Sequence, residues 1–277
     1  MKLLTVTPNA SIDVTMQVAS LGASAVQRSE RSLICGGGKG VNVAQAFVAL
    51  GGEAIATGLF SGPLDWFHRD LQQRGIRSEF LGREGEPRVC LTLLAPGLEQ
   101  KYNDPGQPVT DGAALLKIIA GTKADYVALC GSLPPGLPDD FYLQCAEAAG
   151  DAFVAIDTSG PALRTVVKNL RRGRSLIKAN AEEFCDEPPK FEQCMVTRGG
   201  QGLDLYYKGA WAHFPAPEVN YTSAVGSGDA ALGAYLWALS EGKNPLEAAK
   251  WAVAAGAANA ATLGAGQLKR ADVEALM

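Results

Sequence analysis

Histidine is scarce in this chain, with two residues in 277, and the six cysteines form no C-x-x-C pair. A structural zinc site needs several such ligands at close spacing, so no zinc site is expected. Scattered thiols without a disulfide framework are typical of a reducing compartment. The sequence therefore predicts a cytoplasmic protein without structural zinc and without disulfide bonds.

Blocks of positive charge and long apolar runs are also missing. The net charge is −4, and no basic stripe indicates binding to nucleic acid or to an anionic membrane surface. The Ala-rich stretch 251–265 is interrupted by Gly256, Asn259 and Gly264, which favours a buried helix over a membrane span. The apolar stretch Leu3–Thr7 predicts a strand and is too short for a signal peptide. A soluble enzyme acting on small molecules is expected.

Predicted strands and helices alternate along most of the chain, which indicates an α/β fold with a mostly parallel sheet covered on both faces. The predicted strands are Leu3–Thr7, Glu53–Leu59, Tyr126–Cys130, Phe153–Asp157, Ser175–Lys178 and Cys194–Thr197. The predicted helices are Val41–Leu50, Leu64–Arg74, Ala113–Gly121, Asp139–Ala149, Pro161–Leu170, Ala230–Glu241 and Pro245–Thr262. Residues 12–34 and 88–103 alternate loosely and predict strands outside these layers.

The segment Gly226-Ser227-Gly228-Asp229 precedes an apolar helical pattern. Amides at a helix N-terminus bind anions, because they lack partners within the helix and lie at the positive end of its dipole. An acid would repel that anion, so we interpret Asp229 as a base. It would take a proton from a hydroxyl that attacks a phosphoryl group held by these amides. The alternative is that Asp229 caps the helix, which aspartate does well.

A second glycine-rich turn, residues 36–44, also leads into an apolar helical pattern and carries Lys39 and Asn42. Glycines allow a ligand to approach the backbone closely. One of the two glycine turns carries an acid and the other a lysine. We therefore predict that they bind two ligands and that these ligands meet.

Six segments carry a family resemblance in order: Thr5–Asp13, Gly37–Ala44, Gly131–Pro138, Asp157–Gly160, Lys178–Glu183 and Gly226–Asp229. With them the chain resembles the ribokinase-like (PfkB-type) carbohydrate kinases, from about residue 3 to 265. The match is to the phosphosugar branch that contains 1-phosphofructokinase and tagatose-6-phosphate kinase. The resemblance implies one ribokinase-like α/β domain over 1–277, a three-layer sandwich with a mostly parallel central sheet. It also implies a small β-sheet lid formed by about 12–34 and 88–103, and a homodimer through the lid.

The resemblance implies an acceptor site made of Asp13, Arg28, Gly37, Gly38, Lys39, Asn42 and Arg88. Asp13 would bind sugar hydroxyls, since ionised acceptors make the stronger hydrogen bonds. Converging cations repel one another unless an anion joins them, so Lys39 and Arg88 indicate a sugar that already carries a phosphate. Arg31 could replace Arg28. Alternatively, Asp13 is a turn residue and Arg88 is a solvated edge charge.

The implied nucleotide-binding residues are Lys178, Asn180, Thr197, Gly199, Gly202 and Asn259. ATP would be the donor, and Glu183 would help hold Mg²⁺ through water, with Glu182 as the alternative; Mg²⁺ keeps several waters when bound. Gly226, Ser227 and Gly228 would act with Asp229 in in-line phosphoryl transfer. The alternatives are a plain helix start near Glu183 and an Asn259 that satisfies neighbouring backbone.

One departure from the family pattern is the short connection Phe184–Gln193, where relatives have a helix. It motivates a third hypothesis, a sugar-phosphate or nucleotide sensor that binds without efficient transfer. The first hypothesis is a kinase of fructose 1-phosphate or tagatose 6-phosphate, and the second is a kinase of a free sugar or nucleoside. The sequence leaves open which hydroxyl is phosphorylated.

Overall fold

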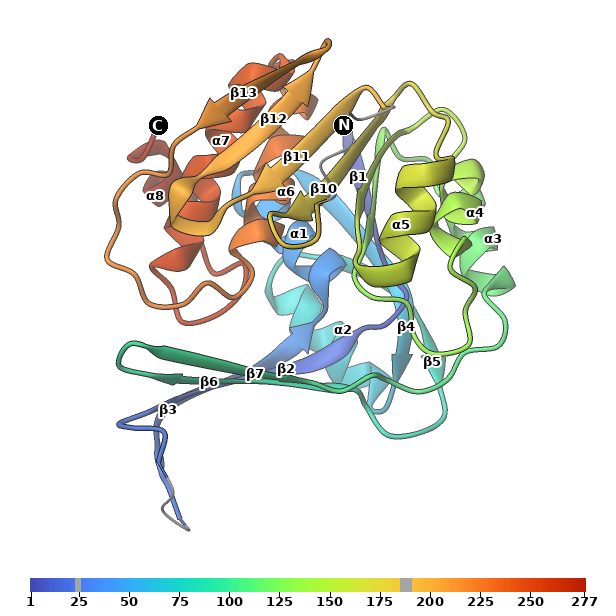
Figure 1. The fold of residues 1–277 in the computed structure, drawn as a ribbon. Coiled ribbons are helices and arrows are strands. Elements are labelled where there is room, and N and C mark those ends of the chain that lie inside the picture. The colour runs from blue at the N-terminus through green and yellow to red at the C-terminus, as the bar shows by residue number, and fades with distance from the viewer. Residues whose placement is uncertain (23–25, 185–190) are drawn as a thin grey trace.

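The computed structural model describes residues 1–22, 26–184 and 191–277. Its centre is a nine-stranded sheet of order β13-β12-β11-β10-β9-β8-β1-β4-β5 (Figure 1). Every pairing in this sheet is parallel except the two that β12 makes. The strands are β1 (Lys2–Thr7), β4 (Glu53–Ser61), β5 (Arg77–Arg83), β8 (Tyr126–Cys130), β9 (Phe153–Asp157), β10 (Ser175–Asn180), β11 (Gln193–Thr197), β12 (Leu203–Tyr207) and β13 (Ala210–Phe214).

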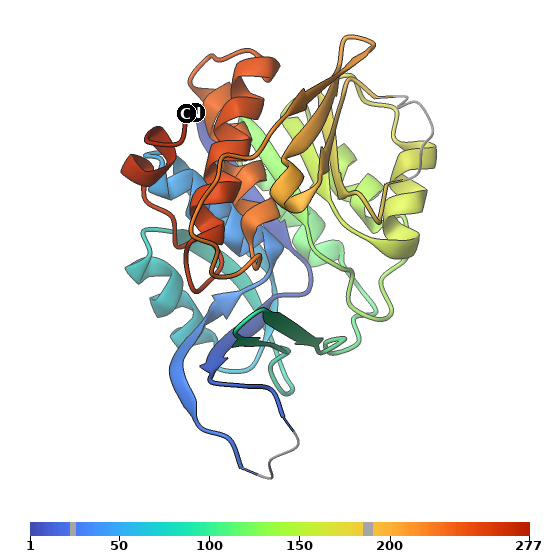
Figure 2. The same ribbon diagram turned by 60° about the vertical axis from the view of Figure 1, so that its left-hand side comes forward.

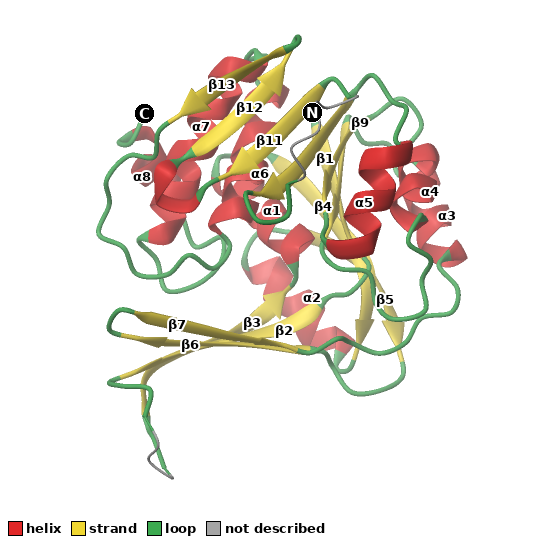
Figure 3. Ribbon diagram, viewed as in Figure 1, coloured by secondary structure: helices red, strands yellow, loops and turns green. Residues whose placement is uncertain are grey.

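Helices cover both faces of this sheet and complete a three-layer sandwich (Figures 2 and 3). One layer contains α1 (Lys39–Ala49), α2 (Leu64–Gln73), α6 (Ser227–Ser240), α7 (Pro245–Ala260) and α8 (Arg270–Glu274). The other contains α3 (Ala113–Gly121), α4 (Phe141–Ala148) and α5 (Gly160–Asn169). Successive strand residues face opposite layers, so Leu3 packs into the first core and Leu4 into the second.

The segments predicted to form a lid make a separate four-stranded sheet of order β3-β2-β6-β7, below the main sheet in Figure 1, and this sheet is called the lid from here on. Its strands are β2 (Ser11–Val18), β3 (Ser29–Gly37), β6 (Val89–Ala95) and β7 (Leu98–Asn103). The pairing register places Asp13 in one row with Cys35, Cys90 and Asn103. The next row, on the opposite face, is Ile34, Val14, Leu91 and Tyr102.

The three-layer architecture, the parallel sheet and the small second sheet confirm the predicted fold class. Three strands and one helix were not predicted: β5, β12, β13 and α8. Helix α6 begins at Ser227 and not at Ala230, so Asp229 lies inside its first turn. Most of the short connection singled out above, residues 185–190, lies outside the described residues. Across the described part of the chain, none of the helices is both long and apolar enough to span a bilayer.

Candidate active site

Gly226 sets the start of α6. It adopts a left-handed conformation with φ 75°, and a side-chain carbon there would lie 2.6 Å from the Cα atom of Ala265. Only glycine fits such a position without strain. Among the described residues no side chain caps this helix. The Ser227 amide donates to the Ala224 carbonyl at 3.2 Å, which leaves the next amides of the first turn, those of Gly228 and Asp229, to take an anion.

Asp229 faces the second glycine turn. Nδ2 of Asn42, in α1, donates a 2.9 Å hydrogen bond to Oδ2 of Asp229. The carboxylate therefore lies inside the first turn of the helix and does not cap it, and the capping alternative is wrong. Asp229 is buried, with 6% of its surface exposed.

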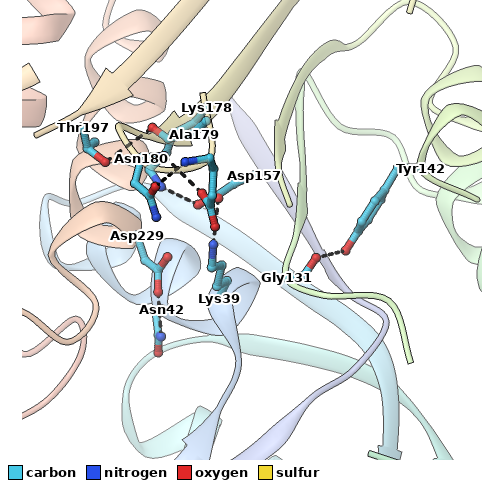
Figure 4. Close-up of polar contacts among 11 residues, drawn as sticks. Lys39, Asn42, Gly131, Tyr142, Asp157, Lys178, Ala179, Asn180, Thr197 and Asp229 are labelled. Carbon is cyan, nitrogen blue, oxygen red and sulfur yellow. Dashed lines mark hydrogen bonds and ion pairs between the residues drawn. The ribbon is translucent and has the colours of Figure 1, made fainter. Parts of the chain in front are cut away.

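Asp157, at the end of β9, joins two lysines beside Asp229 (Figure 4). Nζ of Lys39 lies 2.9 Å from one of its carboxylate oxygens, and Nζ of Lys178 lies 2.7 Å from the other. A side-chain carbon at Gly228 would lie 3.0 Å from Nζ of Lys178, so this ammonium group lies against the α6 turn. Asp157 begins the motif Asp157–Gly160 but had no predicted role, and the structure adds it to the site.

The two buried aspartates differ in proton affinity. Burial, followed by the charge of Asp157, raises the pKa of Asp229, against the opposing effects of Lys39, Lys178 and Asn42. Burial also raises the pKa of Asp157, but Lys178 and Lys39 outweigh it and hold that pKa below its usual value. Two nearby carboxyls with separated pKa values are typical of an acid–base site. Asp229 is the member suited to accept a proton.

Asp13 is held at the base of the lid. Oγ of Ser11 donates a 2.6 Å hydrogen bond to Oδ1 of Asp13. A side-chain carbon at Gly37 would lie 2.1 Å from the carboxyl carbon, so the carboxyl packs directly on that glycine. Burial raises the pKa of Asp13, while hydrogen bonds from Ser11 and the Gly38 amide, and the charge of Arg88, lower it.

Arg88 lies next to this carboxyl. Its Nη1 donates to the Asn9 carbonyl at 2.9 Å and its Nε to the Asp104 carbonyl at 2.7 Å. Arg83 lines the same hollow, together with Asn9 and Gln107. Arg83 was not predicted, because it ends a strand that the sequence pattern did not reveal.

Arg28 is not brought to the other predicted residues. It is exposed and precedes β3, whereas Asp13 pairs with Cys35 near the other end of that strand. At about 3.3 Å per residue, this separation along β3 is roughly 20 Å. Arg31, the alternative, pairs with Gln17 and is also on the outer half of the hairpin.

Asn180 and Glu183 form a reciprocal pair at the end of β10. The Asn180 side-chain oxygen accepts from the Glu182 and Glu183 amides at 2.9 Å, and Oε2 of Glu183 accepts from the Asn180 amide at 3.1 Å. The Glu183 side chain is thus the one tied to Asn180. Within the described ranges no cluster of three or more His, Cys, Asp or Glu residues could hold a metal ion. A metal would need further ligands from phosphate and water, as Mg²⁺ commonly has.

The other predicted nucleotide residues follow β11. Oγ1 of Thr197 donates to the Ala179 carbonyl at 3.5 Å, and Gly199 has a φ of 54° in a short turn. Gly202, with φ 99°, lies so close to the Phe214 carbonyl that a side-chain carbon would be 2.0 Å from its oxygen. These residues lie at the same edge of the sheet as Lys178.

The polar atoms of the Asn259 side chain are bonded within the protein. Its side chain is fully buried, and its Nδ2 donates to the Val225 carbonyl at 2.7 Å. Its Oδ1 accepts from the Gly266 amide at 2.6 Å. The structure thus supports the alternative given for Asn259, a polar residue that satisfies neighbouring backbone, and makes it a support for the α6 turn.

Comparison with solved structures gives similar folds. Phosphofructokinase-2 from Escherichia coli, solved with substrates and products, matches with a TM-score of 0.89 and 23% identity over 100% of this chain and 98% of that one. A possible 1-phosphofructokinase of Thermotoga maritima matches with a TM-score of 0.87 and 21% identity over 99% and 97%. Ribokinase of Thermotoga maritima matches with a TM-score of 0.76 and 20% identity over 99% and 98%. The model of the pfkB family of carbohydrate kinases matches residues 1–271, and this chain belongs to that family.

Proposed function

We propose that this chain catalyses the ATP- and Mg²⁺-dependent phosphorylation of a hydroxyl on a ketohexose phosphate, as 1-phosphofructokinase and tagatose-6-phosphate kinase do. The observation that supports it most is Asp229. It is a buried carboxylate of raised pKa, placed beside two ammonium groups at the open amide end of α6.

In the proposed reaction the acceptor hydroxyl attacks the γ-phosphoryl group of ATP, the bond between that group and ADP breaks, and Asp229 accepts the proton of the hydroxyl. The Gly228 and Asp229 amides and the ammonium groups of Lys39 and Lys178 stabilise charge on the transferred phosphoryl group. Asp13 orients the acceptor by accepting hydrogen bonds from its hydroxyls, together with the backbone of Gly37 and Gly38. Positioning and electrostatics account for most of the rate enhancement in such transfers.

We place the phosphate already on the acceptor beside Arg83 and Arg88, the two cations that line one small hollow next to Asn9. Arginine is suited to phosphate because its donors form a planar fork. Lys39 was expected at that phosphate, but its ammonium group pairs with Asp157 at 2.9 Å. This pairing supports placing Lys39 at the transferred phosphoryl group, with the arginines on the acceptor's phosphate.

The nucleotide would bind along the edge that carries Lys178, Asn180, Thr197, Gly199 and Gly202. Glu183 is the carboxylate there that could hold Mg²⁺ through water. When bound, Mg²⁺ would neutralise charge on the donor phosphates.

Coupled ADP release with Mg-ATP tests the acceptor class. The panel is fructose 1-phosphate, fructose 6-phosphate, tagatose 6-phosphate, fructose and ribose. We expect rapid turnover with one phosphorylated ketose. Arg88→Met should raise KM for that acceptor far more than for ATP, because it removes a charge from the proposed phosphate site. Turnover with free sugars alone contradicts the phosphosugar proposal, and ATP binding without turnover favours a sensor.

The outer face of the lid supports a homodimer. Ile34 and Tyr102 are 55% and 56% exposed, in one row with Val14 and Leu91. Exposed apolar rows of this kind mark protein interfaces. We expect sedimentation velocity to give twice the chain mass of 29.0 kDa, and Ile34→Lys to give a monomer. A wild-type protein that sediments as a monomer at all concentrations excludes this interface.

A further inference from the structure

Glu99, on lid strand β7, reaches the loop that precedes α6. Its Oε2 accepts hydrogen bonds from Oγ of Ser223 at 2.9 Å, from the Ala224 amide at 3.0 Å and from the Tyr221 hydroxyl at 3.4 Å. Its Oε1 lies 2.8 Å from Nζ of Lys101. The side chain is only 16% exposed. One carboxylate therefore holds three successive points of a loop more than a hundred residues away.

The loop that Glu99 holds leads directly into the Gly226–Asp229 turn and is hydrogen-bonded to it. Oγ of Ser223 also accepts from the Val225 amide at 3.1 Å, and the Ala224 carbonyl accepts from the Ser227 amide at 3.2 Å. Asn259 binds the Val225 carbonyl from the other side. Glu99 and Asn259 thus bind the two residues before Gly226, Glu99 through the Ala224 amide and Asn259 through the Val225 carbonyl, so we expect a shift of either side chain to move the start of α6.

The placement of Glu99 follows from the lid register. Glu99 and Asn103 are four residues apart on β7, so they share a face, and Asn103 lies in the row of Asp13. Leu33 of β3 is on this same inner face and packs against Gly264, where a side-chain carbon would lie 2.3 Å from its Cδ2. The inner face of the lid therefore meets the C-terminal layer through an apolar contact and through Glu99.

Glu99 is suited to a strong contact. Burial raises its pKa, but Lys101, the Ala224 amide and Ser223 outweigh burial, so its pKa lies below the usual glutamate value. The carboxylate is ionised at neutral pH, and hydrogen bonds to ionised acceptors are about twice as strong as neutral ones.

We propose that Glu99 is a positioning residue that fastens the lid to residues 221–225 and so aligns the Gly226–Asp229 turn with the acceptor held under the lid. Its kinetic consequence rests on the proposed kinase function, whereas the fastening itself does not. Glu99 touches neither reactant. It acts through residues 221–225. It thereby links the lid that covers the acceptor to the position of the Asp229 carboxylate.

The test combines hydrogen exchange and kinetics on the full chain. In Glu99→Ala, and to a smaller extent in Glu99→Gln, amides of residues 221–229 should exchange faster in the ligand-free protein. The value of kcat should fall about 10- to 100-fold, the effect of losing a hydrogen bond to a charged group. KM for ATP should stay within about twofold if nucleotide contacts are untouched. Lys101→Met is the matched control, because it leaves the Oε2 contacts in place, and it should resemble the wild type.

Unchanged exchange at 221–229 in Glu99→Ala overturns the proposal, whatever happens to activity. If Glu99→Ala fails to fold, Glu99→Gln and Ser223→Ala make the same comparison from the two sides of the contact. If the wild type phosphorylates no acceptor but residues 221–229 exchange faster in Glu99→Ala, the fastening is supported and the kinase function is rejected. Normal turnover with unchanged exchange rejects the fastening alone.

Discussion

Asp229→Asn should lower kcat by about 10²- to 10⁴-fold, the usual contribution of a positioned general base. Asparagine keeps the size of the side chain and can still accept the hydrogen bond from Asn42, so the turn and the fold should persist. Binding of ATP and of the sugar should change little. Rapid-quench kinetics measures the first effect and calorimetric titration the second. Asp204→Asn, on β12, is the control and should keep wild-type turnover. A variant with activity within a few-fold of wild type excludes Asp229 as the base.

The pH profile gives a second arm of that test. Because the pKa of Asp229 is raised, kcat/KM should fall as the pH is lowered through a value above the ordinary aspartate range. Asn42→Leu removes a hydrogen bond that lowers this pKa, so the acid limb should move to higher pH. The second ionisation of a phosphorylated acceptor, near pH 6, would not move with Asn42. An acid limb unchanged in Asn42→Leu therefore assigns it to substrate and not to Asp229.

Asp157→Leu should destabilise the protein by about 3–5 kcal/mol, the cost of leaving one member of a buried ion pair uncompensated. Only 5% of the Lys178 side chain is accessible, so its ammonium group cannot turn to solvent when Asp157 is removed. The Lys39 side chain is 36% accessible, and its ammonium group can turn to solvent. Urea unfolding followed by circular dichroism measures the loss.

The double variant Asp157→Leu with Lys178→Met is the decisive comparison. Replacing a whole buried ion pair by apolar groups is often close to neutral, so the double variant should regain most of the lost stability. Glu274→Ala removes an exposed ion pair with Arg270 and should have a much smaller effect. If the double variant is as unstable as the sum of the two single ones, Asp157 and Lys178 are not energetically coupled.

The sequence was sufficient for the fold wherever a segment was uniformly apolar or strongly periodic. Strand β9, Phe153–Asp157, is buried throughout and was predicted with its bounds. In contrast β5, Arg77–Arg83, buries only Phe80 and carries three charges, so its pattern resembles a surface loop. Strands β12 and β13 form an edge hairpin of two five-residue strands; β12 alternates buried and half-buried positions over only four residues, and β13 has no buried residue. Such edge strands depend on a neighbour that local sequence does not reveal.

The site was predictable where chemistry lies in contiguous motifs, and less so where it depends on side-chain direction. Asp229, Asn42 and Lys39 come together as two meeting turns would require. The partner of Lys39 did not follow from its motif, because the motif does not say which anion its flexible stem will reach. Glu99 lacked any local signal, since its partners are more than a hundred residues away.

The contacts that build the proposed catalytic cluster of Lys39, Asn42, Asp157, Lys178 and Asp229 span very different lengths of chain. Lys178 and Asp157 are 21 residues apart, Lys39 and Asp157 are 118 apart, and Asn42 and Asp229 are 187 apart. Closing a longer loop costs more chain entropy and delays contact formation. We therefore expect the nucleotide edge, built from successive neighbours β8 to β12, to order early during folding. We expect the contact between Asn42 of α1 and Asp229 to form late, because it closes a loop of 187 residues and needs both ends of the chain in place.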